Sequence, residues 1–173
     1  NTGSLSDDGI GVWAYRDGIE TISGGDGNDL LYGNHGSEIL VGGSGNDSIY
    51  GGQNNDTIYG HNGDDSLMGN RGDDHLVGGP GNDTMVGGAG SDRFETSSSS
   101  TDTSRDQVND FSTSDDQIAI HTAVGVSSFN DLTITASSNG ALVQWTTIYG
   151  TTMAIDLIGV DPNSLSASNF TFI

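Results

Sequence analysis

Eight acidic side chains recur at nine-residue intervals, and each one follows a glycine-rich turn. They are Asp29, Glu38, Asp47, Asp56, Asp65, Asp74, Asp83 and Asp92. A carboxylate at the end of such a turn can supply one hard oxygen ligand, and the carbonyls of the turn can supply more. Ca²⁺ prefers a flexible shell of about six to eight oxygens, whereas Mg²⁺ demands a tighter octahedron and Zn²⁺ prefers His or Cys. The residue types and their spacing therefore predict calcium sites.

A single acid in a glycine-rich turn is most simply an Asx-turn residue that accepts a backbone N–H. An unbroken series of eight is different, because carboxylates stacked roughly 5 Å apart repel each other unless a cation lies between them. One turn supplies about three ligands, so each ion is predicted to lie between two turns on the same side, eighteen residues apart.

This spacing divides the acids into two series on opposite sides of the stack. The first series is Asp29, Asp47, Asp65 and Asp83; the second is Glu38, Asp56, Asp74 and Asp92, and Asp110 lies one further step of eighteen along. Adjacent pairs predict three ions in the first series and up to four in the second, depending on whether the longer Glu38 side chain fits. The expected cofactor is therefore Ca²⁺, with roughly six to seven ions bound.

The acids belong to eight consecutive nonamers that run from Gly24 to Glu95. They read GGDGNDLLY, GNHGSEILV, GGSGNDSIY, GGQNNDTIY, GHNGDDSLM, GNRGDDHLV, GGPGNDTMV and GGAGSDRFE. The first six positions favour turns, because glycine accepts positive φ, and the last three favour a short strand. Stacked in parallel, such strands bury a continuous ladder of apolar position-eight side chains, and two nonamers make one coil of eighteen residues.

The sequence around the repeats predicts three regions. Residues 1–23 resemble degenerate capping turns, with Gly9 and Gly18 in frame; residues 24–95 form the repeat region. After the polar linker TSSSSTDTS, residues 96–173 contain the strand-forming runs DQIAI, LTITA, ALVQW and MAIDLIGV, and SSNG is predicted to be a hairpin loop. The predicted fold class is all-β: a right-handed parallel β-roll capped by a C-terminal antiparallel β unit.

The composition agrees with a cation-binding module. The 173 residues include 24 acidic and 4 basic side chains, for a net charge of −20, and only 32% are hydrophobic. Such a chain is near the disordered boundary unless its charge is neutralised, and neither nucleic acid binding nor membrane insertion is expected. The absence of cysteine excludes disulfides and thiolate metal sites.

The nonamers resemble the GGxGxDxUx repeats of the RTX family, which are calcium-binding parallel β-rolls of proteins secreted by the bacterial type I pathway. The resemblance extends to RDQVNDFSTSDDQIAI after the repeats. IDLIGVDPNSLSASNFTFI is similar to the C-termini of secreted lipases and of alginate epimerase repeat modules, and NFTFI is similar to an uncleaved type I secretion signal.

The resemblance also implies a set of backbone ligands. In the family's pattern an ion is held by the position-two and position-four carbonyls with the acid of one turn, and by the position-one and position-three carbonyls with the acid of the next turn on that side. For the first series these carbonyls belong to Gly25, Gly27, Gly42, Gly43, Ser44, Gly45, Gly60, His61, Asn62, Gly63, Gly78 and Pro80. For the second series they belong to Gly52, Asn54, Gly69, Asn70, Arg71, Gly72, Gly87, Gly88, Ala89 and Gly90.

Some positions depart from that pattern and put the turn geometry in question. Asn34, His61 and Asn70 replace glycine at position two, Asn54 replaces it at position four, and Glu38 replaces aspartate.

The resemblance implies a calcium-binding module that folds on calcium binding outside the bacterial cell, supports type I secretion and stabilises a larger extracellular protein. Its expected partners are calcium and the type I secretion apparatus. The alternative is a calcium-dependent polysaccharide- or surface-binding module, with an anionic polysaccharide contacted by bound calcium or by one of the four basic residues Arg16, Arg71, Arg93 and Arg105.

An enzyme is not predicted, because HExxH, G-x-S-x-G and P-loop motifs are absent and His35, His61, His75 and His121 are scattered. Any catalytic domain of the parent protein is expected upstream. Tyr32, Tyr50 and Tyr59 share position nine and are predicted to form one stripe on the outer face that packs against the next coil.

Overall fold

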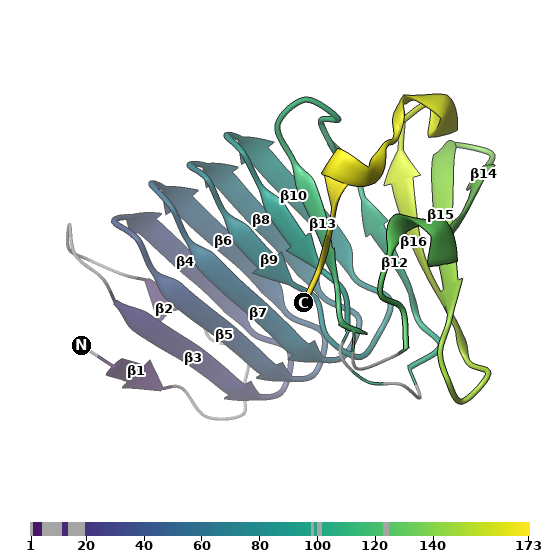
Figure 1. Cartoon of the computed structure of the whole chain (residues 1–173). Helices are drawn as coiled ribbons and strands as arrows, with labels where there is room; N and C mark the ends of the chain where they lie inside the picture. The colour runs from purple at the N-terminus through teal and green to yellow at the C-terminus, as the bar shows by residue number, and fades with distance from the viewer. Residues whose placement is uncertain (1, 5–11, 14–19, 98, 100–101, 123–124) are drawn as a thin grey trace.

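The chain folds as a parallel β-solenoid of about four turns, whose strands lie side by side in two facing layers (Figure 1). The computed structural model describes residues 2–4, 12–13, 20–97, 99, 102–122 and 125–173. The two glycines of the predicted capping turns, Gly9 and Gly18, lie outside the described residues.

Consecutive strands of the solenoid alternate between the two layers. One sheet has the order β1-β3-β5-β7-β9-β11-β13-β17, and the other has the order β14-β15-β16-β12-β10-β8-β6-β4-β2. The strands up to the end of the repeats are β1 (Thr2–Ser4), β2 (Val12–Trp13), β3 (Thr21–Asp26), β4 (Leu30–His35), β5 (Ile39–Ser44), β6 (Ser48–Gln53), β7 (Thr57–Asn62), β8 (Ser66–Arg71), β9 (His75–Val77), β10 (Thr84–Ala89) and β11 (Arg93–Glu95).

The position-eight side chains fill the space between the layers. In one sheet Leu31 pairs with Ile49, and in the other Leu40 pairs with Ile58, so identical repeat positions stack at a period of eighteen residues. All eight are at most 1% exposed: Leu31, Leu40, Ile49, Ile58, Leu67, Leu76, Met85 and Phe94. Burial of each such side chain contributes about 1.5–3 kcal/mol, and the predicted apolar ladder is confirmed.

The two sheets continue beyond the last nonamer. β12 (Arg105–Val108) pairs in parallel with β10, and β13 (Gln117–Ile120) pairs in parallel with β11. Val108 aligns with Met85 and Ile118 aligns with Phe94, and both are fully buried. The flank therefore extends the stacked core, although its strands are joined by segments that do not follow the nonamer frame.

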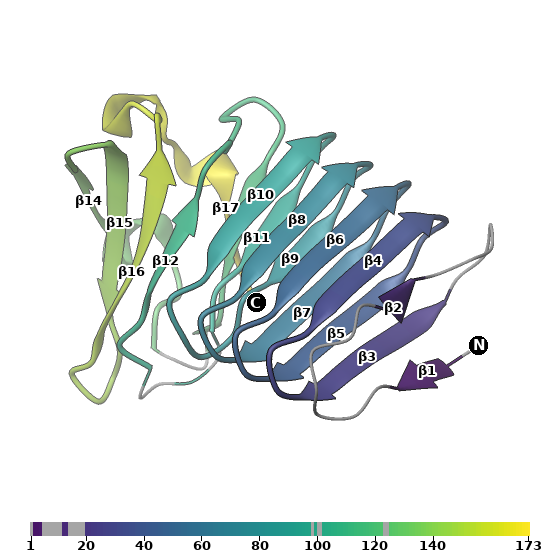
Figure 2. The same ribbon diagram turned by 180° about the vertical axis from the view of Figure 1, so that it is seen from behind.

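An antiparallel unit completes the C-terminal end. It comprises β14 (Thr133–Ala136), β15 (Gly140–Thr146) and β16 (Thr152–Ile158), and the SSNG segment joins β14 to β15 as predicted. β16 lies parallel beside β12 and β17 (Phe170–Phe172) beside β13, so this unit is continuous with the roll (Figure 2).

Short 3₁₀ helices complete this end, namely η2 (Phe129–Asp131), η3 (Pro162–Ser164) and η4 (Ala167–Asn169). No helix among the described residues is long and apolar enough to cross a membrane.

Candidate metal centre

The glycine-rich turns lie at the two opposite edges of the roll. Turns of the first series lead from the eight-stranded sheet to the nine-stranded one, and turns of the second series lead back. Positions two and four have positive φ in all eight nonamers. Glycine adopts this conformation without a steric penalty, which explains its frequency at these positions.

The four non-glycine residues at these positions keep the turn. Asn34, Asn54, His61 and Asn70 have φ between 69° and 77°, within the left-handed region that asparagine tolerates. The ring of His61 also stacks on Tyr59, with the centroids 6.0 Å apart. The departures from the repeat pattern therefore do not remove the turns.

The acids of each series form a continuous hydrogen-bonded ladder with a period of eighteen residues. The backbone N–H of Asp29 donates to Oδ1 of Asp47 at 2.8 Å, and the N–H of Asp47 donates to Oδ1 of Asp65 at 2.8 Å. In the second series Glu38 donates to Asp56 in the same way at 2.8 Å. Each acid thus contacts the turns before and after it on its own edge.

The other carboxylate oxygen, Oδ2, points back over the position-one glycine. A Cβ atom on Gly42 would overlap Oδ2 of Asp47 and would lie 2.8 Å from the carbonyl oxygen of Gly60. A Cβ atom on Gly60 would similarly overlap Oδ2 of Asp65 and lie 2.6 Å from the carbonyl of Gly78. The acid of one turn and the position-one carbonyl of the next therefore face one small space, which is the grouping expected at a shared ion.

Several of these Oδ2 atoms are buried and accept no hydrogen bond from any described residue. They belong to Asp47, Asp65, Asp74 and Asp83, whose side chains are 1–3% exposed. A buried polar atom without a partner costs about 1–3 kcal/mol, and more when it is charged. A hard divalent cation would satisfy these atoms, so the residues present fit Ca²⁺.

The electrostatics indicate the same need for positive charge. Burial, with a smaller contribution from neighbouring carboxylates, raises the pKa of Asp65 to about 7 and that of Asp83 to about 9. Burial, with the neighbouring Asp56 carboxylate, also raises the pKa of Glu38 to about 8. These acids are therefore difficult to ionise in the folded chain unless a cation lies beside them.

The predicted position-three carbonyls also take part in backbone pairing. Those of Ser44, Asn62, Pro80 and Ala89 accept hydrogen bonds of 2.7–3.0 Å from the position-four N–H of the preceding turn on that edge. A carbonyl oxygen has two lone pairs, so this pairing leaves room for a metal ligand. The described residues contain no cluster of three His, Asp or Glu side chains arranged to hold a metal ion.

Two acids of the flank occupy the next place in each ladder. The N–H of Asp83 donates to Oδ1 of Asp106 at 3.1 Å, and the N–H of Asp92 donates to Oδ1 of Asp116 at 2.9 Å. Neither acid was predicted from the sequence, because the segments that precede them are not nine residues long. The motif D-x-apolar, as in Asp106-Gln107-Val108, is the signal that could have identified them.

The structure corrects the predicted place of Asp110. Asp110 does not take the ladder position after Asp92, which Asp116 occupies. Its carboxylate instead accepts hydrogen bonds from the N–H groups of Gly87 and Gly88, at 3.0 and 2.8 Å. The step of eighteen residues fails here because the chain from 96 to 116 is longer than two nonamers.

A second ladder, not predicted from the sequence, runs along the exposed position five. The N–H of Asn46 donates to Oδ1 of Asn28 at 2.8 Å, and the N–H of Asp64 donates to Oδ1 of Asn46 at 3.0 Å. Its direction along the stack is opposite to that of the buried acids. Most neighbouring turns on an edge are therefore tied together by two antiparallel sets of side-chain hydrogen bonds.

The structure also corrects the predicted tyrosine stripe, because the three tyrosines do not lie on one sheet. Tyr32 and Tyr50 stack on the nine-stranded sheet, with centroids 5.0 Å apart and planes 12° apart. Tyr59 lies on the other sheet, between Val41 and Val77, because consecutive nonamers alternate between layers.

The scattered histidines include one pair that shares a partner. His75 and His121 both contact the carboxylate of Glu95 through Nε2, at 2.8 and 2.9 Å. These contacts lower the pKa of Glu95, His75 contributing most. The cluster joins the end of the repeats to the flank.

The fold and site together define a parallel β-solenoid with stacked, acid-bearing turns, which is a class of metal-binding repeat module. Residues 16–47, 32–67 and 59–94 match the model of the RTX calcium-binding nonapeptide repeat. The repeat region of this chain therefore belongs to the RTX calcium-binding nonapeptide repeat family.

Two solved structures give more detail, whereas no curated protein matches the chain. The AlgE6R3 subunit of a mannuronan C5-epimerase from Azotobacter vinelandii is 28% identical with a TM-score of 0.51, over 86% of this chain and 80% of that chain. The AlgE6R2 subunit of the same enzyme is 27% identical with a TM-score of 0.53, over 75% of this chain and 92% of that chain. This chain is thus similar to the repeat subunits of an epimerase.

Proposed function

We propose that this chain is a calcium-dependent folding module of a larger bacterial protein that acts outside the cell. The observation that supports the proposal most directly is the row of buried Oδ2 atoms without hydrogen-bond partners, of which those of Asp47, Asp65 and Asp74 face the same space as a carbonyl of the next turn. Bound Ca²⁺ supplies positive charge and accepts these hard oxygens as ligands. The acids, in turn, hold adjacent turns together through their Oδ1 atoms.

The pairs of acids suggest where the ions bind. The ladder contains four neighbouring pairs in the first series, ending at Asp83 with Asp106, and four in the second, ending at Asp92 with Asp116. We assign one ion to each pair whose turns also offer carbonyls. The number expected from the sequence, roughly six to seven, thus rises to as many as eight if both flank acids take part.

Calcium concentration then determines whether the module folds. Because the ligand set exists only in the folded chain, each ion adds about 2.7 kcal/mol when Ca²⁺ is at about a hundred times its dissociation constant. In a cytosol poor in calcium, the net charge of −20 keeps the chain unfolded and able to pass through a type I secretion apparatus. Folding outside the cell then stabilises the parent protein, and the module itself is non-catalytic.

The division of labour within the chain follows from this proposal. Residues 1–23 cap the roll, residues 24–95 hold the ions, and residues 96–173 close the stack and contain the C-terminal secretion signal. The continuity of β12 and β13 with the sheets supports a closing role for the last region.

Far-UV circular dichroism during a calcium titration tests the proposal, with magnesium at equal concentration as the control. We expect β structure to form cooperatively with calcium and not with magnesium. A spectrum that is already fully folded in excess chelator and unchanged by calcium would contradict the proposal.

A second candidate function is calcium-dependent binding of an anionic polysaccharide. A groove of about 410 Å³ lies on the nine-stranded sheet and is lined by the stacked pair of Tyr32 and Tyr50 together with Arg71. Aromatic faces and a cation suit a uronate chain. Alginate should bind in millimolar calcium and bind more weakly to Arg71→Ala than to Arg93→Ala; an absence of affinity in millimolar calcium excludes this function.

A further inference from the structure

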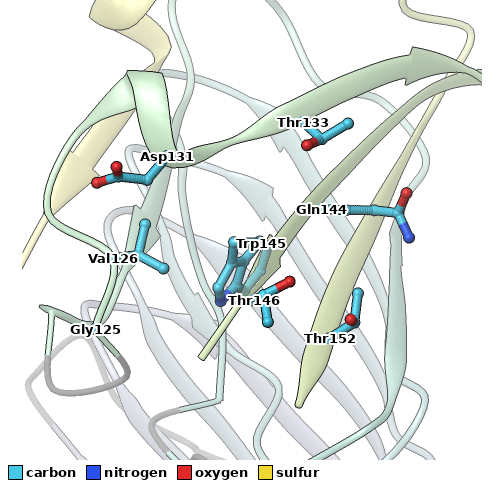
Figure 3. Close-up of a pocket in the computed structure, with 8 residues that line it drawn as sticks. All are labelled: Gly125, Val126, Asp131, Thr133, Gln144, Trp145, Thr146 and Thr152. Atoms are coloured by element: carbon cyan, nitrogen blue, oxygen red, sulfur yellow. The ribbon is translucent and has the colours of Figure 1, made fainter. Parts of the chain in front are cut away.

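A separate hollow of about 450 Å³ opens in the C-terminal antiparallel unit, away from the turns of the repeats (Figure 3). It exists because β14 is shorter than its partner strand. Thr133, the first residue of β14, pairs with Gln144 of β15, whereas Trp145 and Thr146 pair only with β16. One side of β15 is therefore uncovered over its last two residues.

The hollow is lined mainly by hydrogen-bonding side chains that carry no positive charge. Gln144 offers an amide, and Thr133, Thr146 and Thr152 offer hydroxyls. Among the described residues that line the hollow, Asp131 alone is charged, and its Oδ2 accepts hydrogen bonds from the backbone N–H groups of Ser127 and Ser128. The Ser127 N–H contributes most to lowering the pKa of Asp131, so this side chain is an anion at neutral pH.

The indole of Trp145 also lines the hollow. Its side chain is 3% exposed, yet Nε1 makes no hydrogen bond to any described residue. Figure 3 shows the ring between Val126 and Thr146. A buried indole N–H normally donates a hydrogen bond to an acceptor. No described residue supplies such an acceptor at this part of the hollow.

An exposed aromatic side chain lies on the turn that follows one of the strands at the hollow. Tyr149 is 72% exposed at the turn between β15 and β16, whose end residues Thr146 and Thr152 line the hollow. The turn is ordered by Thr147, whose hydroxyl accepts hydrogen bonds from the N–H groups of Tyr149 and Thr151 at 3.3 and 3.2 Å. A large aromatic ring held in solvent by a fixed turn is suited to stacking on a ligand.

We infer that this hollow binds a neutral saccharide of one or two rings, with Tyr149 stacking on a sugar face at its edge. Sugar hydroxyls both donate and accept, so they can pair with the Gln144 amide, the threonine hydroxyls and the Asp131 carboxylate at once. Asp131 repels anionic sugars, and none of the three arginines that the structure describes, Arg71, Arg93 and Arg105, lines the hollow. A hollow of this volume is within the range of small-molecule sites, about 300–1,000 Å³.

Saturation-transfer difference NMR tests this inference on the full chain, folded in calcium as judged by circular dichroism. The probes are glucose, galactose, mannose, N-acetylglucosamine, cellobiose and chitobiose, with galacturonate as the anionic comparison. At least one neutral sugar should show saturable transfer, and galacturonate should bind more weakly.

Matched variants place the binding at the hollow. Gln144→Leu and Tyr149→Ala should each weaken binding by about tenfold, which corresponds to loss of about one hydrogen bond or ring contact. The controls Gln107→Leu and Tyr59→Ala change the same residue types outside the hollow and should leave binding unchanged. The inference is overturned if none of the neutral probes binds at millimolar concentration, if galacturonate binds as well as they do, or if both hollow variants bind normally.

Discussion

The substitution Asp65→Asn isolates the role of charge at a buried turn position. Asp65 stands between Asp47 and Asp83 in the first series, so two of the proposed ions depend on it. Asparagine keeps an Oδ1 acceptor for the N–H of Asp47 but removes the negative charge. Each site contributes about 2.7 kcal/mol when calcium is at about a hundred times its dissociation constant. If both ions are lost, the free energy of unfolding should therefore fall by about 5 kcal/mol under that condition.

The neighbouring residue offers a matched control. Asp64→Asn makes the same change of charge one position away, where the side chain is exposed and Oδ1 accepts from the N–H of Asn82 at 2.8 Å. Asparagine already occupies this repeat position in Asn28 and Asn46, so the expected loss is within about 0.5 kcal/mol. Urea unfolding in saturating calcium, followed by circular dichroism, measures both variants.

Removing calcium should reverse the order of stability of the two variants. In chelator, burial has raised the pKa of Asp65 to about 7, so its ionised form destabilises the folded state at neutral pH. The Asp65→Asn variant should then be at least as compact as Asp64→Asn. Equal urea midpoints for the two variants in saturating calcium would refute the assignment of Asp65 as a shared ligand.

Three further predictions follow from the same geometry. Gly60→Ala should raise the calcium midpoint of folding in circular dichroism several-fold, because the added Cβ displaces Oδ2 of Asp65 and approaches the carbonyl of the next turn. In chelator, any folded structure should be present near pH 5 and lost as the pH rises toward 9. The reason is that burial raises the pKa of Asp83 to about 9, so the folded chain binds protons more tightly than the unfolded chain. Circular dichroism measured against pH tests this. Asp116→Asn should lower the number of calcium ions measured by isothermal titration calorimetry, whereas Asp110→Asn should not, since Asp116 occupies the ladder place.

The repeat frame made most of the roll predictable. A period of nine residues with an apolar position eight identified the buried residues from Leu31 to Phe94, because each nonamer contributes one short strand with one inward side chain. The same period, doubled, predicted that Asp47 lies between Asp29 and Asp65 and away from Asp56. The doubled period also separates Tyr59 from the other two tyrosines, so that error came from applying nine where eighteen was required.

The flank was less predictable because its connecting segments vary in length. Asp106 follows Asp83 by 23 residues and Asp116 follows Asp92 by 24, so a fixed step of eighteen selected Asp110 instead. The strands themselves keep the repeat pattern, with an acid at position six and Val108 or Ile118 at position eight. The hollow beside Trp145 had no sequence signal at all, since it depends on where β14 begins relative to β15.

Asp116 also explains how the second series can end without a further ion. Its Oδ1 accepts the N–H of Asp92, as in every earlier turn, but its Oδ2 accepts the N–H of Ser112 at 2.8 Å. In the repeats the corresponding Oδ2 atoms of Asp56 and Asp74 lack a hydrogen-bond donor. Phe111, just before this turn, packs on Phe94 with ring centroids 6.1 Å apart, and both side chains are buried. A backbone N–H thus takes the place of a cation beyond the last pair of the second series, Asp92 with Asp116.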